Sequence, residues 1–301
     1  MKHDAIVIGG SFAGLAAATY LARGRRDVAV IDAGAPRNRF AAHSHGFLGF
    51  DGVPPGDIVE QAKTQLAAYP TISQLTGAVA SAERRNDGFA VTLGSGEVLT
   101  GDKLILAFGI SDVLPEIPGL AERWGTSVIH CPYCHGYEFA GQRLGVLGMS
   151  PNSIHQAMLI PEWGPTTFFL NGQPEPDTAT LGELAKRNVH IERSPVTELR
   201  GEGTALSTVQ MADGRLSRID ALYIGAPTRL NSALAEQLGC ALDDGPLGKI
   251  VRTDAMKLTT VPDVWAVGDI TRGFHNVTFA VADGVMAGTA AHRSLVFPAA
   301  A

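Results

Sequence analysis

The sequence predicts an α/β fold of two doubly wound domains, the second inserted into the first. Two stretches of chain each run from a buried strand through a glycine-containing turn into a helix, and a third such strand lies near the C-terminus. Proline-containing breaks frame the middle of the chain. The length of 301 residues also exceeds one ordinary core, since domains typically span about 100–200 residues.

The first strand, turn and helix occupy the N-terminal 23 residues. Residues 5–8 form an apolar run without alternation, which is typical of a strand buried on both faces of a parallel sheet. Residues 9–14 are a turn rich in small residues, and residues 15–23 are Ala-rich and helix-prone. Residues 28–31 form a second buried strand that ends at Asp32. The segment therefore predicts a βαβ unit with a right-handed connection.

Two later segments repeat parts of this pattern. Residues 143–159 again read as strand, turn and helix. Residues 264–267 read as a third strand that ends in Gly268 and Asp269. A helix rich in small residues is expected to follow, from about residue 277 to residue 295.

The two breaks define the expected domain organisation. Residues 111–118 carry two prolines and read as a linker, and residues 225–227 form a similar break. We therefore expect one discontinuous domain from residues 1–111 and 229–301, and an inserted domain from residues 112–228.

Composition excludes several classes of protein. The net charge is −6 and no run of Lys or Arg occurs, which argues against a nucleic acid partner. No apolar run reaches the roughly 18 residues of a membrane span, and the N-terminus lacks the pattern of a cleavable signal. Three cysteines are too few for a disulfide scaffold. These features predict a cytoplasmic protein without a membrane or nucleic acid partner.

The first glycine turn has the features of a pyrophosphate site. Such a turn needs small side chains, because its backbone approaches the phosphates and the helix N-terminus supplies N–H donors. Gly9-x-Ser11-x-x-Gly14 meets this need with Ser at the middle position. Asp32 stands about where an acid would hold ribose hydroxyls. A tight turn without a ligand, and a plain capping role for Asp32, remain the alternatives.

Several motifs together resemble those of the flavin-dependent pyridine nucleotide-disulfide oxidoreductases. Residues 6–15 resemble the FAD-binding opening of that family, and residues 104–109 resemble its Ala-Thr-Gly strand, with Phe for Thr. Residues 264–269 resemble its second FAD motif. The motif order, with Cys131 and Cys134 between, is similar to that of the low-molecular-weight thioredoxin reductases over essentially the whole chain. The resemblance implies a thioredoxin reductase-like pair of Rossmann-like domains.

The resemblance implies that the outer domain binds FAD. The residues expected to bind it are Gly9, Gly10, Ser11, Ala13, Gly14, Asp32, Ala107, Gly109, Gly268, Asp269, Asn276 and Val277. Asp269 would hold the ribityl chain. His275, Asn276 and Val277 lie where reductases carry an Arg-Gln-Ala triplet that touches the flavin ring, and they depart from that triplet. Residues 43–50 lie where the family packs chain against FAD, although the aromatic side chains there fit an ordinary core equally well.

A Cys-x-x-Cys motif carries the expected chemistry. Cys131 and Cys134 can close a small disulfide. If Pro132 opens a helix, Cys131 lies at its N-terminal end, where the helix dipole favours the thiolate that exchanges with other disulfides. Flanking histidines leave zinc as an alternative, but no second Cys/His pair stands at a suitable spacing. Cys240 is expected to be a small buried hydrophobic residue.

The resemblance also assigns roles within this motif. Cys134 would face the flavin, and Cys131 would form the mixed disulfide with the substrate. His135 replaces the Asp that acts as acid and base in reductases, and imidazole titrates near neutrality. Glu138 and His130 are further candidate proton carriers.

The second glycine turn departs from the reductase pattern for NADPH. Gly148 is followed by Met149 and Ser150 in place of small residues, and Pro151 lacks an N–H donor. The next strand, residues 166–170, ends without an Arg to hold a 2′-phosphate. We therefore expect that this domain keeps its fold but not its nucleotide, with weak NADH binding as the alternative.

These observations predict an FAD-dependent dithiol oxidase that forms a disulfide in a small molecule or peptide and passes the electrons to O2. The segment from Cys131 to Gly136 resembles that of the gliotoxin- and holomycin-type dithiol oxidases. Two alternatives stay open: a thioredoxin-type reductase fed by NAD(P)H or ferredoxin, and a non-catalytic flavin- or metal-binding protein. The resemblance also favours a homodimer.

Overall fold

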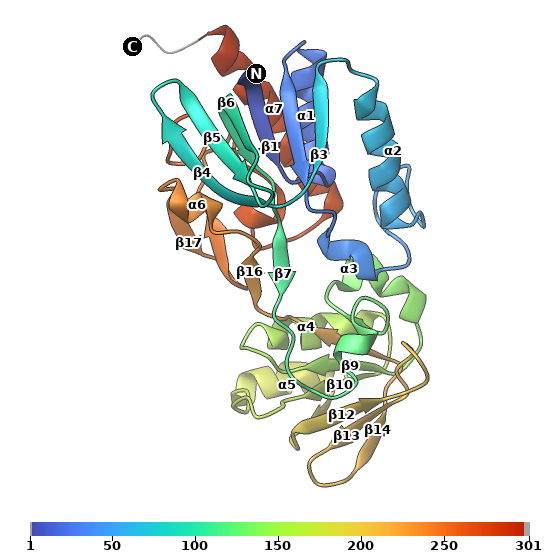
Figure 1. The fold of residues 1–301 in the computed structure, drawn as a ribbon. Helices are drawn as coiled ribbons and strands as arrows, with labels where there is room; N and C mark the ends of the chain where they lie inside the picture. Colours follow the sequence, from blue (N-terminus) through green and yellow to red (C-terminus); the bar gives the residue numbers. More distant parts are fainter. Residues whose placement is uncertain (1, 298–301) are drawn as a thin grey trace. The chain divides into compact units, whose positions relative to one another are not determined.

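The structure is a computed structural model that describes residues 2–297, and its chain divides into two compact units (Figure 1). Unit 1 extends over Met1–Arg39, Gly56–Ser111 and Thr228–Ala301, and unit 2 over Phe40–Pro55 and Asp112–Pro227. Both units are α/β, as the sequence predicts. Among residues 2–297, no helix has both the length and the apolar character that crossing a membrane requires.

A seven-stranded sheet forms the centre of unit 1. Its strands are β1 (Lys2–Ile8), β2 (Val28–Asp32), β3 (Ile72–Thr76), β4 (Val79–Arg85), β5 (Gly88–Leu93), β6 (Val98–Leu106) and β19 (Val264–Ala266). The order is β3-β2-β1-β6-β5-β4, and β19 pairs with β6. β1 pairs in parallel with β2 and β6, whereas β4 and β5 form an antiparallel extension.

The central strand is apolar on both faces because both faces are covered. Ile6 and Ile8 point into one buried cluster, and Ala5 and Val7 point into the other. Ala5, Ile6 and Val7 are completely buried. This explains why residues 5–8 show no alternation in the sequence.

Helices pack against this sheet. They are α1 (Phe12–Arg23), α2 (Pro55–Ala67), α6 (Leu234–Gln237) and α7 (Val277–Val296), with the short 3₁₀ turns η1 (Arg37–Phe40) and η5 (Gly268–Thr271). α1 and α7 lie side by side (Figure 1). The close approach requires Gly284 on α7, because a Cβ there would overlap the Ala13 carbonyl of α1.

Unit 2 is built on a five-stranded parallel sheet with the order β11-β10-β9-β15-β8. These strands are β8 (Val128–Ile129), β9 (Leu144–Leu147), β10 (Thr166–Phe169), β11 (His190–Glu192) and β15 (Ala221–Ile224). β12 (Val196–Arg200), β13 (Thr208–Met211) and β14 (Leu216–Arg218) form an antiparallel sheet. The helices are α3 (Pro132–His135), α4 (Ser153–Leu159) and α5 (Thr178–Lys186), with η2 (Ala121–Arg123), η3 (Tyr137–Phe139) and η4 (Ile160–Glu162).

Two small sheets complete the fold. β7 (Ile110–Asp112) pairs with β16 (Thr228–Leu230), and β17 (Leu242–Asp244) pairs with β18 (Lys249–Val251). β7 and β16 coincide with the two positions at which the sequence breaks, so the chain makes a short two-stranded sheet there instead of a plain linker. The sequence patterns gave no sign of this pairing.

The loop Phe40–Pro55 groups with unit 2, whereas sequence analysis assigned it to the outer domain. Its side chains explain the grouping. Phe40 lies so close to Gly125 that a Cβ on that glycine would be 2.6 Å from the Phe40 Cβ. His45 Nε2 lies 3.5 Å from Glu138 Oε1.

Candidate active site

The first glycine turn connects β1 to α1 and leaves no room for side chains. Gly9 has a φ of +116°, and a Cβ there would overlap the Ala107 carbonyl oxygen. A Cβ on Gly14 would overlap the Gly9 carbonyl oxygen. The backbone of the turn is therefore bare and tightly folded, as a pyrophosphate cradle requires.

Ser11 and Asp32 flank this turn. Ser11 is the N-cap of α1, and within the described part of the chain its hydroxyl makes no capping bond to the helix. Asp32 lies beside Gly10, where an added Cβ would be 2.6 Å from the Asp32 Cβ. The turn thus places a small hydroxyl and a carboxylate at the start of the helix.

Lys63, on α2, is a partner of Asp32 that sequence analysis missed. Its Nζ lies 3.2 Å from Asp32 Oδ2 and 3.2 Å from Glu60 Oε1. Burial alone would lower the pKa of Lys63, but the hydrogen bonds to the two carboxylates outweigh burial and raise it. The positive charge therefore stays beside Asp32 at neutral pH.

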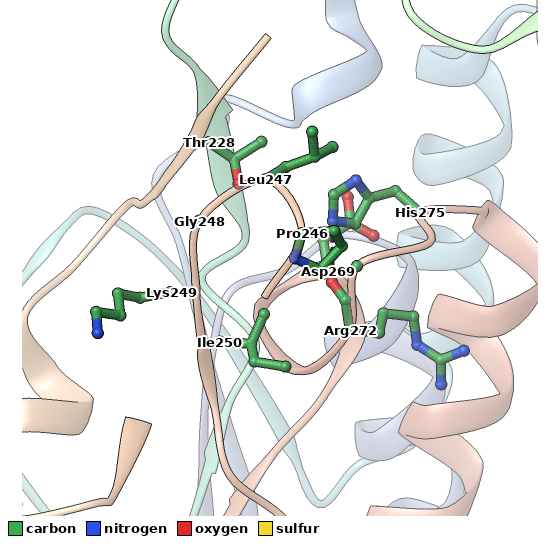
Figure 2. A pocket seen from close by; sticks show the side chains of 10 residues that line it. Thr228, Pro246, Leu247, Gly248, Lys249, Ile250, Asp269, Arg272 and His275 are labelled. Carbon is green, nitrogen blue, oxygen red and sulfur yellow. Dashed lines mark hydrogen bonds between the residues drawn. The ribbon is translucent and has the colours of Figure 1, made fainter. Parts of the chain in front are cut away.

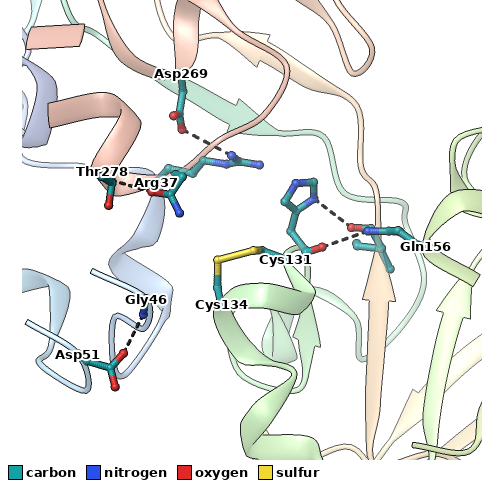
Figure 3. Close-up of a disulfide and its surroundings, with 11 residues drawn as sticks. Arg37, Gly46, Asp51, Cys131, Cys134, Gln156, Asp269 and Thr278 are labelled. Carbon is teal, nitrogen blue, oxygen red and sulfur yellow. Dashed lines mark hydrogen bonds and ion pairs between the residues drawn. A yellow bond between two sulfur atoms is a disulfide. The ribbon is translucent and has the colours of Figure 1, made fainter. Parts of the chain in front are cut away.

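The second motif, at the end of β19, places Gly268 and Asp269 in unit 1. Gly268 has a φ of +76°, and a Cβ there would be 3.1 Å from the Ala13 Cβ. Asp269 Oδ2 lies 3.6 Å from Arg37 Nη1 (Figure 3). Arg37 is far from Asp269 in sequence, so no local pattern could indicate this pair.

A buried carboxylate on α7 holds this second motif in place. Asp283 is 1% exposed and accepts the Gly268 N–H at 3.3 Å. Arg272 Nε lies 3.1 Å from Asp283 Oδ2, and Lys257 Nζ lies 2.9 Å from Oδ1. Sequence analysis assigned Asp283 no role, although a carboxylate within an Ala- and Gly-rich helix is a signal that a buried partner exists.

Asn276 and Val277 begin α7. Asn276 Oδ1 accepts the Thr278 N–H at 2.8 Å, so this side chain is the helix N-cap. Val277 is the first helical residue. Gly109, another expected cofactor residue, follows β6 and has a φ of +68°.

A small pocket in unit 1 borders Asp269, Arg272 and His275 (Figure 2). It encloses almost no space that a water-sized sphere could enter. Ordinary small-molecule pockets hold about 300–1,000 Å³. The pocket is therefore too small to be a separate ligand site, and it belongs to the surroundings of the second motif.

In unit 2, Cys131 and Cys134 form a disulfide with their Cα atoms 5.3 Å apart (Figure 3). Pro132 opens α3 and Cys131 is its N-cap, as the sequence predicts. However, α3 has only four residues. A helix dipole is the sum of aligned peptide dipoles, so one turn favours a Cys131 thiolate less than sequence analysis expected.

The backbone before the disulfide is anchored to the parallel sheet and to α4. His130 Nδ1 lies 3.2 Å from the Ile224 carbonyl, and the His130 carbonyl accepts a bond from Gln156 Nε2 at 3.1 Å (Figure 3). These contacts give His130 a role in holding the motif, in addition to the proton-carrying role considered from sequence.

His135 follows the disulfide and is half-buried. Burial lowers its pKa; the Glu138 carboxylate opposes this shift, and the neighbouring His45 adds to it. The imidazole is therefore neutral at pH 7 and able to accept a proton. The structure thus brings together the disulfide, His135 and Glu138, and adds His45.

The second glycine turn, between β9 and α4, is filled by its own side chains. Ser153 is 1% exposed, and its Oγ accepts the N–H groups of Met149 at 3.0 Å and Ser150 at 3.4 Å. The next residue, Pro151, has no N–H. Two N–H donors of this turn are therefore occupied, and Pro151 supplies none.

An arginine that the sequence did not indicate lies near the end of β10. It is Arg193, from the loop after β11, and its side chain is 61% exposed. Arg193 is paired with Glu175, with Nε 3.2 Å from Oε2. The hydrogen bond from Arg193 lowers the pKa of Glu175, which keeps the pair charged and bonded.

The remaining cysteine and the zinc alternative can be placed as well. Cys240 is buried beside Thr259, as predicted, and burial raises the pKa of its thiol. Within residues 2–297, no group of three or more His, Cys, Asp or Glu side chains is arranged to hold a metal ion.

Comparison with known proteins identifies the family. The model of the pyridine nucleotide-disulphide oxidoreductase family matches residues 3–284. The chain belongs to this family. It is 32% identical to "Thioredoxin reductase tcpT" of Claviceps purpurea (strain 20.1), over 97% of this chain and 94% of that protein.

Comparison with solved structures shows that the similarity extends to the fold. An oxidoreductase from Agrobacterium tumefaciens superposes with a TM-score of 0.95 at 47% identity, over 99% of this chain and 100% of that chain. The crystal structure of HlmI superposes with a TM-score of 0.92 at 36% identity, over 97% of this chain and 92% of that chain. The thioredoxin reductase-like architecture expected from sequence is confirmed.

The family is FAD-binding, and the protein is an FAD-dependent oxidoreductase. The residues present in unit 1 fit this cofactor. The turn from Gly9 to Gly14 has a bare backbone that a side chain would otherwise fill. Asp32 and Asp269 each lie at the carboxyl end of a parallel strand, where ligands of doubly wound sheets bind.

Proposed function

We propose that this oxidoreductase is a dithiol oxidase, which converts a dithiol in a small molecule or peptide into a disulfide. Two S–H bonds break and one S–S bond forms. The two electrons and two protons released reduce O2 to hydrogen peroxide. FAD, when bound, would accept the electron pair from the dithiol and pass it to the acceptor.

The filled second turn carries this proposal. A reductase in this fold needs a bare turn for the pyrophosphate of its nicotinamide donor. Ser153 occupies the N–H groups of Met149 and Ser150, and Glu175 occupies Arg193. The disulfide and the first turn keep the features that they need, so the entry of electrons through sulfur is the route these residues support.

The chain's own residues divide the work as follows. FAD would be held by Gly9, Gly10, Ser11, Ala13, Gly14, Asp32, Ala107, Gly109, Gly268, Asp269, Asn276 and Val277. A substrate thiolate would attack Cys131, and Cys134 would leave as a thiolate. His135, neutral because burial lowers its pKa, would take the proton from the substrate thiol. The Glu138 carboxylate would oppose the lowering of the His135 pKa by burial, and it would balance the positive charge on His135 after the proton is taken up.

The second candidate is a thioredoxin-type reductase fed by NAD(P)H or ferredoxin. The names of similar proteins favour it, since the relative from Claviceps purpurea and another from Leptosphaeria maculans are both called thioredoxin reductases. The two candidates share the disulfide exchange and differ in the source and destination of the electrons.

A homodimer in the cytoplasm completes the proposal. The resemblance to thioredoxin reductases supports the dimer. The small number of cysteines, with Cys240 unpaired and buried, supports a reducing compartment. Light scattering of the FAD-loaded protein would give twice the 31.6 kDa of one chain if the dimer is right.

Oxygen uptake tests the function. With dithiothreitol as the probe and no nucleotide, we expect one O2 consumed and one peroxide formed per disulfide produced. Cys134→Ala should abolish uptake while FAD stays bound, and Cys240→Ala is the matched control that should keep it. NADPH-driven reduction of a disulfide, without dithiol-dependent oxygen uptake, would establish the reductase instead.

A further inference from the structure

Beside the disulfide, unit 2 gathers more titratable side chains than the exchange itself requires. They are His135, His45, Glu138, Asp51 and His43. His45 lies between the others: its Nε2 is 3.5 Å from Glu138 Oε1 and its Nδ1 is 3.7 Å from Asp51 Oδ1. Its ring meets that of His135 edge-on, with the centroids 6.3 Å apart.

The loop that carries His45 is built to hold it. Ser44 and Val53 pair as an antiparallel bridge. The Gly46 N–H donates to Asp51 Oδ1 at 2.8 Å (Figure 3), and Phe47 stacks on Phe50 with centroids 5.4 Å apart. Both ring nitrogens of His45 therefore face carboxylates as a consequence of the loop fold.

The two carboxylates are more exposed than the imidazole between them. His135 and His45 are both half-buried, whereas the side chain of Glu138 is 37% exposed and that of Asp51 is 71% exposed. Burial lowers the pKa of His135, and the nearby His45 ring lowers it further. A proton taken up by His135 is therefore held weakly. On His45 it would have an ion-pair partner at each ring nitrogen.

Two further titratable groups, Tyr223 and His43, lie near this cluster. Burial, together with the charge of Glu138, raises the pKa of Tyr223, so its phenol stays protonated at neutral pH. His43 is exposed and contacts the ring of His45 at 6.3 Å between centroids. His45 is thus the group placed between the base and the carboxylates.

We propose that His45 is a positioning residue of the thiol–disulfide exchange, which carries the proton that His135 removes from the substrate thiol to Glu138 and Asp51 and so to water. The inference rests on the exchange step of the proposed function, which the oxidase and the reductase share.

The step balances without a further reactant. The substrate S–H bond breaks, its proton goes to His135 and its sulfur bonds to Cys131 Sγ. The Cys131–Cys134 bond breaks, and its electron pair leaves on Cys134 as a thiolate. His45 then gives a proton to Asp51 as it takes up the one that leaves His135, so the net charge of His45 does not change.

Opening of the disulfide tests the inference separately from the oxidase function. The FAD-loaded protein is mixed with dithiothreitol under nitrogen and quenched by alkylation, and the labelled Cys134 is counted by mass spectrometry between about pH 5 and 8. O2 takes no part, and excess dithiothreitol opens the disulfide again after any electrons reach FAD, so the proposed oxidase could fail while this test succeeds. Circular dichroism and FAD content confirm that each variant is folded.

In His45→Gln we expect opening at neutral pH to slow by about ten- to a hundredfold, less than the roughly 10²–10⁴-fold effect of removing the base itself. The pH profile should shift to higher pH, because His45 no longer lowers the pKa of His135. Imidazole in the buffer should restore the rate of His45→Gly, as a replacement proton carrier. The matched control, His43→Gln in the same loop, should keep the normal rate and profile.

Three results would overturn the inference. One is a normal rate and pH profile in His45→Gln. The second is an equal loss in His43→Gln. The third is a slow His45→Gly that imidazole does not restore, since this would make His45 a purely structural residue.

Discussion

The two glycine turns of the molecule, one in each unit, follow the same path from a parallel strand into a helix and differ in what fills them. In unit 1, Gly9 and Gly14 leave the backbone bare, because any Cβ there would overlap a carbonyl oxygen. In unit 2, the Ser153 hydroxyl accepts two turn N–H groups, and Pro151 removes another donor.

The difference shows that a strand–turn–helix unit keeps its fold when one of its own side chains caps the N–H groups of the turn. Gly148 remains in the second turn for a structural reason, since a Cβ there would overlap the Leu170 carbonyl. The glycine that the fold needs is therefore separable from the bare N–H groups that a ligand needs. Changes to each turn should accordingly have different effects.

The largest expected effect is on the amount of bound FAD when a glycine in one of the two turns is replaced by alanine. Gly14→Ala should lose nearly all bound FAD, because the new Cβ cannot fit against the Gly9 carbonyl. Gly148→Ala should strain unit 2 but retain FAD. The measurement is FAD per chain after gel filtration, with Gly56→Ala, which has open space, as the control. FAD retained at the normal level in Gly14→Ala would contradict the assignment of the first turn.

A smaller effect is expected from the buried network beside the second motif of unit 1. Asp283→Asn leaves Arg272 and Lys257 without a buried carboxylate, and breaking such a network costs about 3–5 kcal/mol. Thermal unfolding should show the loss, and FAD affinity should fall with it. Asp243→Asn, which breaks an exposed pair with Arg252, is the control and should change little. Equal melting temperatures in Asp283→Asn and Asp243→Asn would mean that Asp283 does not stabilise the second motif.

Ser153→Ala tests the filled turn directly. It leaves two partly buried N–H groups without an acceptor, so we expect a loss of about 1 kcal/mol in the free energy of unfolding. NADPH binding should stay undetectable by calorimetry, because Pro151 and Met149 remain. The variant that also carries Met149→Gly and Pro151→Ala should gain weak binding. Ser95→Ala, in an exposed turn, serves as the control. Tight NADPH binding by the unmodified protein would contradict the comparison.

The smallest effect is expected at the edge of the first turn. Lys63→Met leaves Asp32 without its cation, next to where the phosphates of FAD would lie. The pair is partly exposed and worth less than about 1 kcal/mol, so the Kd for FAD should rise by less than about fivefold. Flavin fluorescence titration gives the Kd, and Lys186→Met is the exposed control. Tighter FAD binding in Lys63→Met would show that Lys63 opposes the cofactor.

Features encoded in contiguous residues could be predicted from the sequence. The strand, turn and helix around Gly9 are local, as are the helix that begins at Val277 and the N-cap position of Cys131 before Pro132. The departure of the second turn could also be seen, because Met149 and Pro151 lie within one motif. Local spacing determines these features.

Contacts between distant segments could not be predicted in this way. The pairing of Arg37 with Asp269 and the position of His45 between two carboxylates depend on loops whose course no periodicity sets. The bonds from the turn N–H groups to Ser153 could not be predicted either, because they depend on the direction in which its hydroxyl points. The buried Asp283 was the one such residue with a readable signal, a charge in a small-residue helix.

Anaerobic reduction of the bound flavin tests the central claim most directly. The FAD-loaded protein is mixed either with dithiothreitol or with NADPH in the absence of oxygen, and the flavin absorbance is followed. The account predicts that the dithiol bleaches the flavin, that NADPH leaves it unchanged, and that air restores the colour. Rapid bleaching by NADPH would contradict the account, because it would mean that electrons enter through the turn that Ser153 fills.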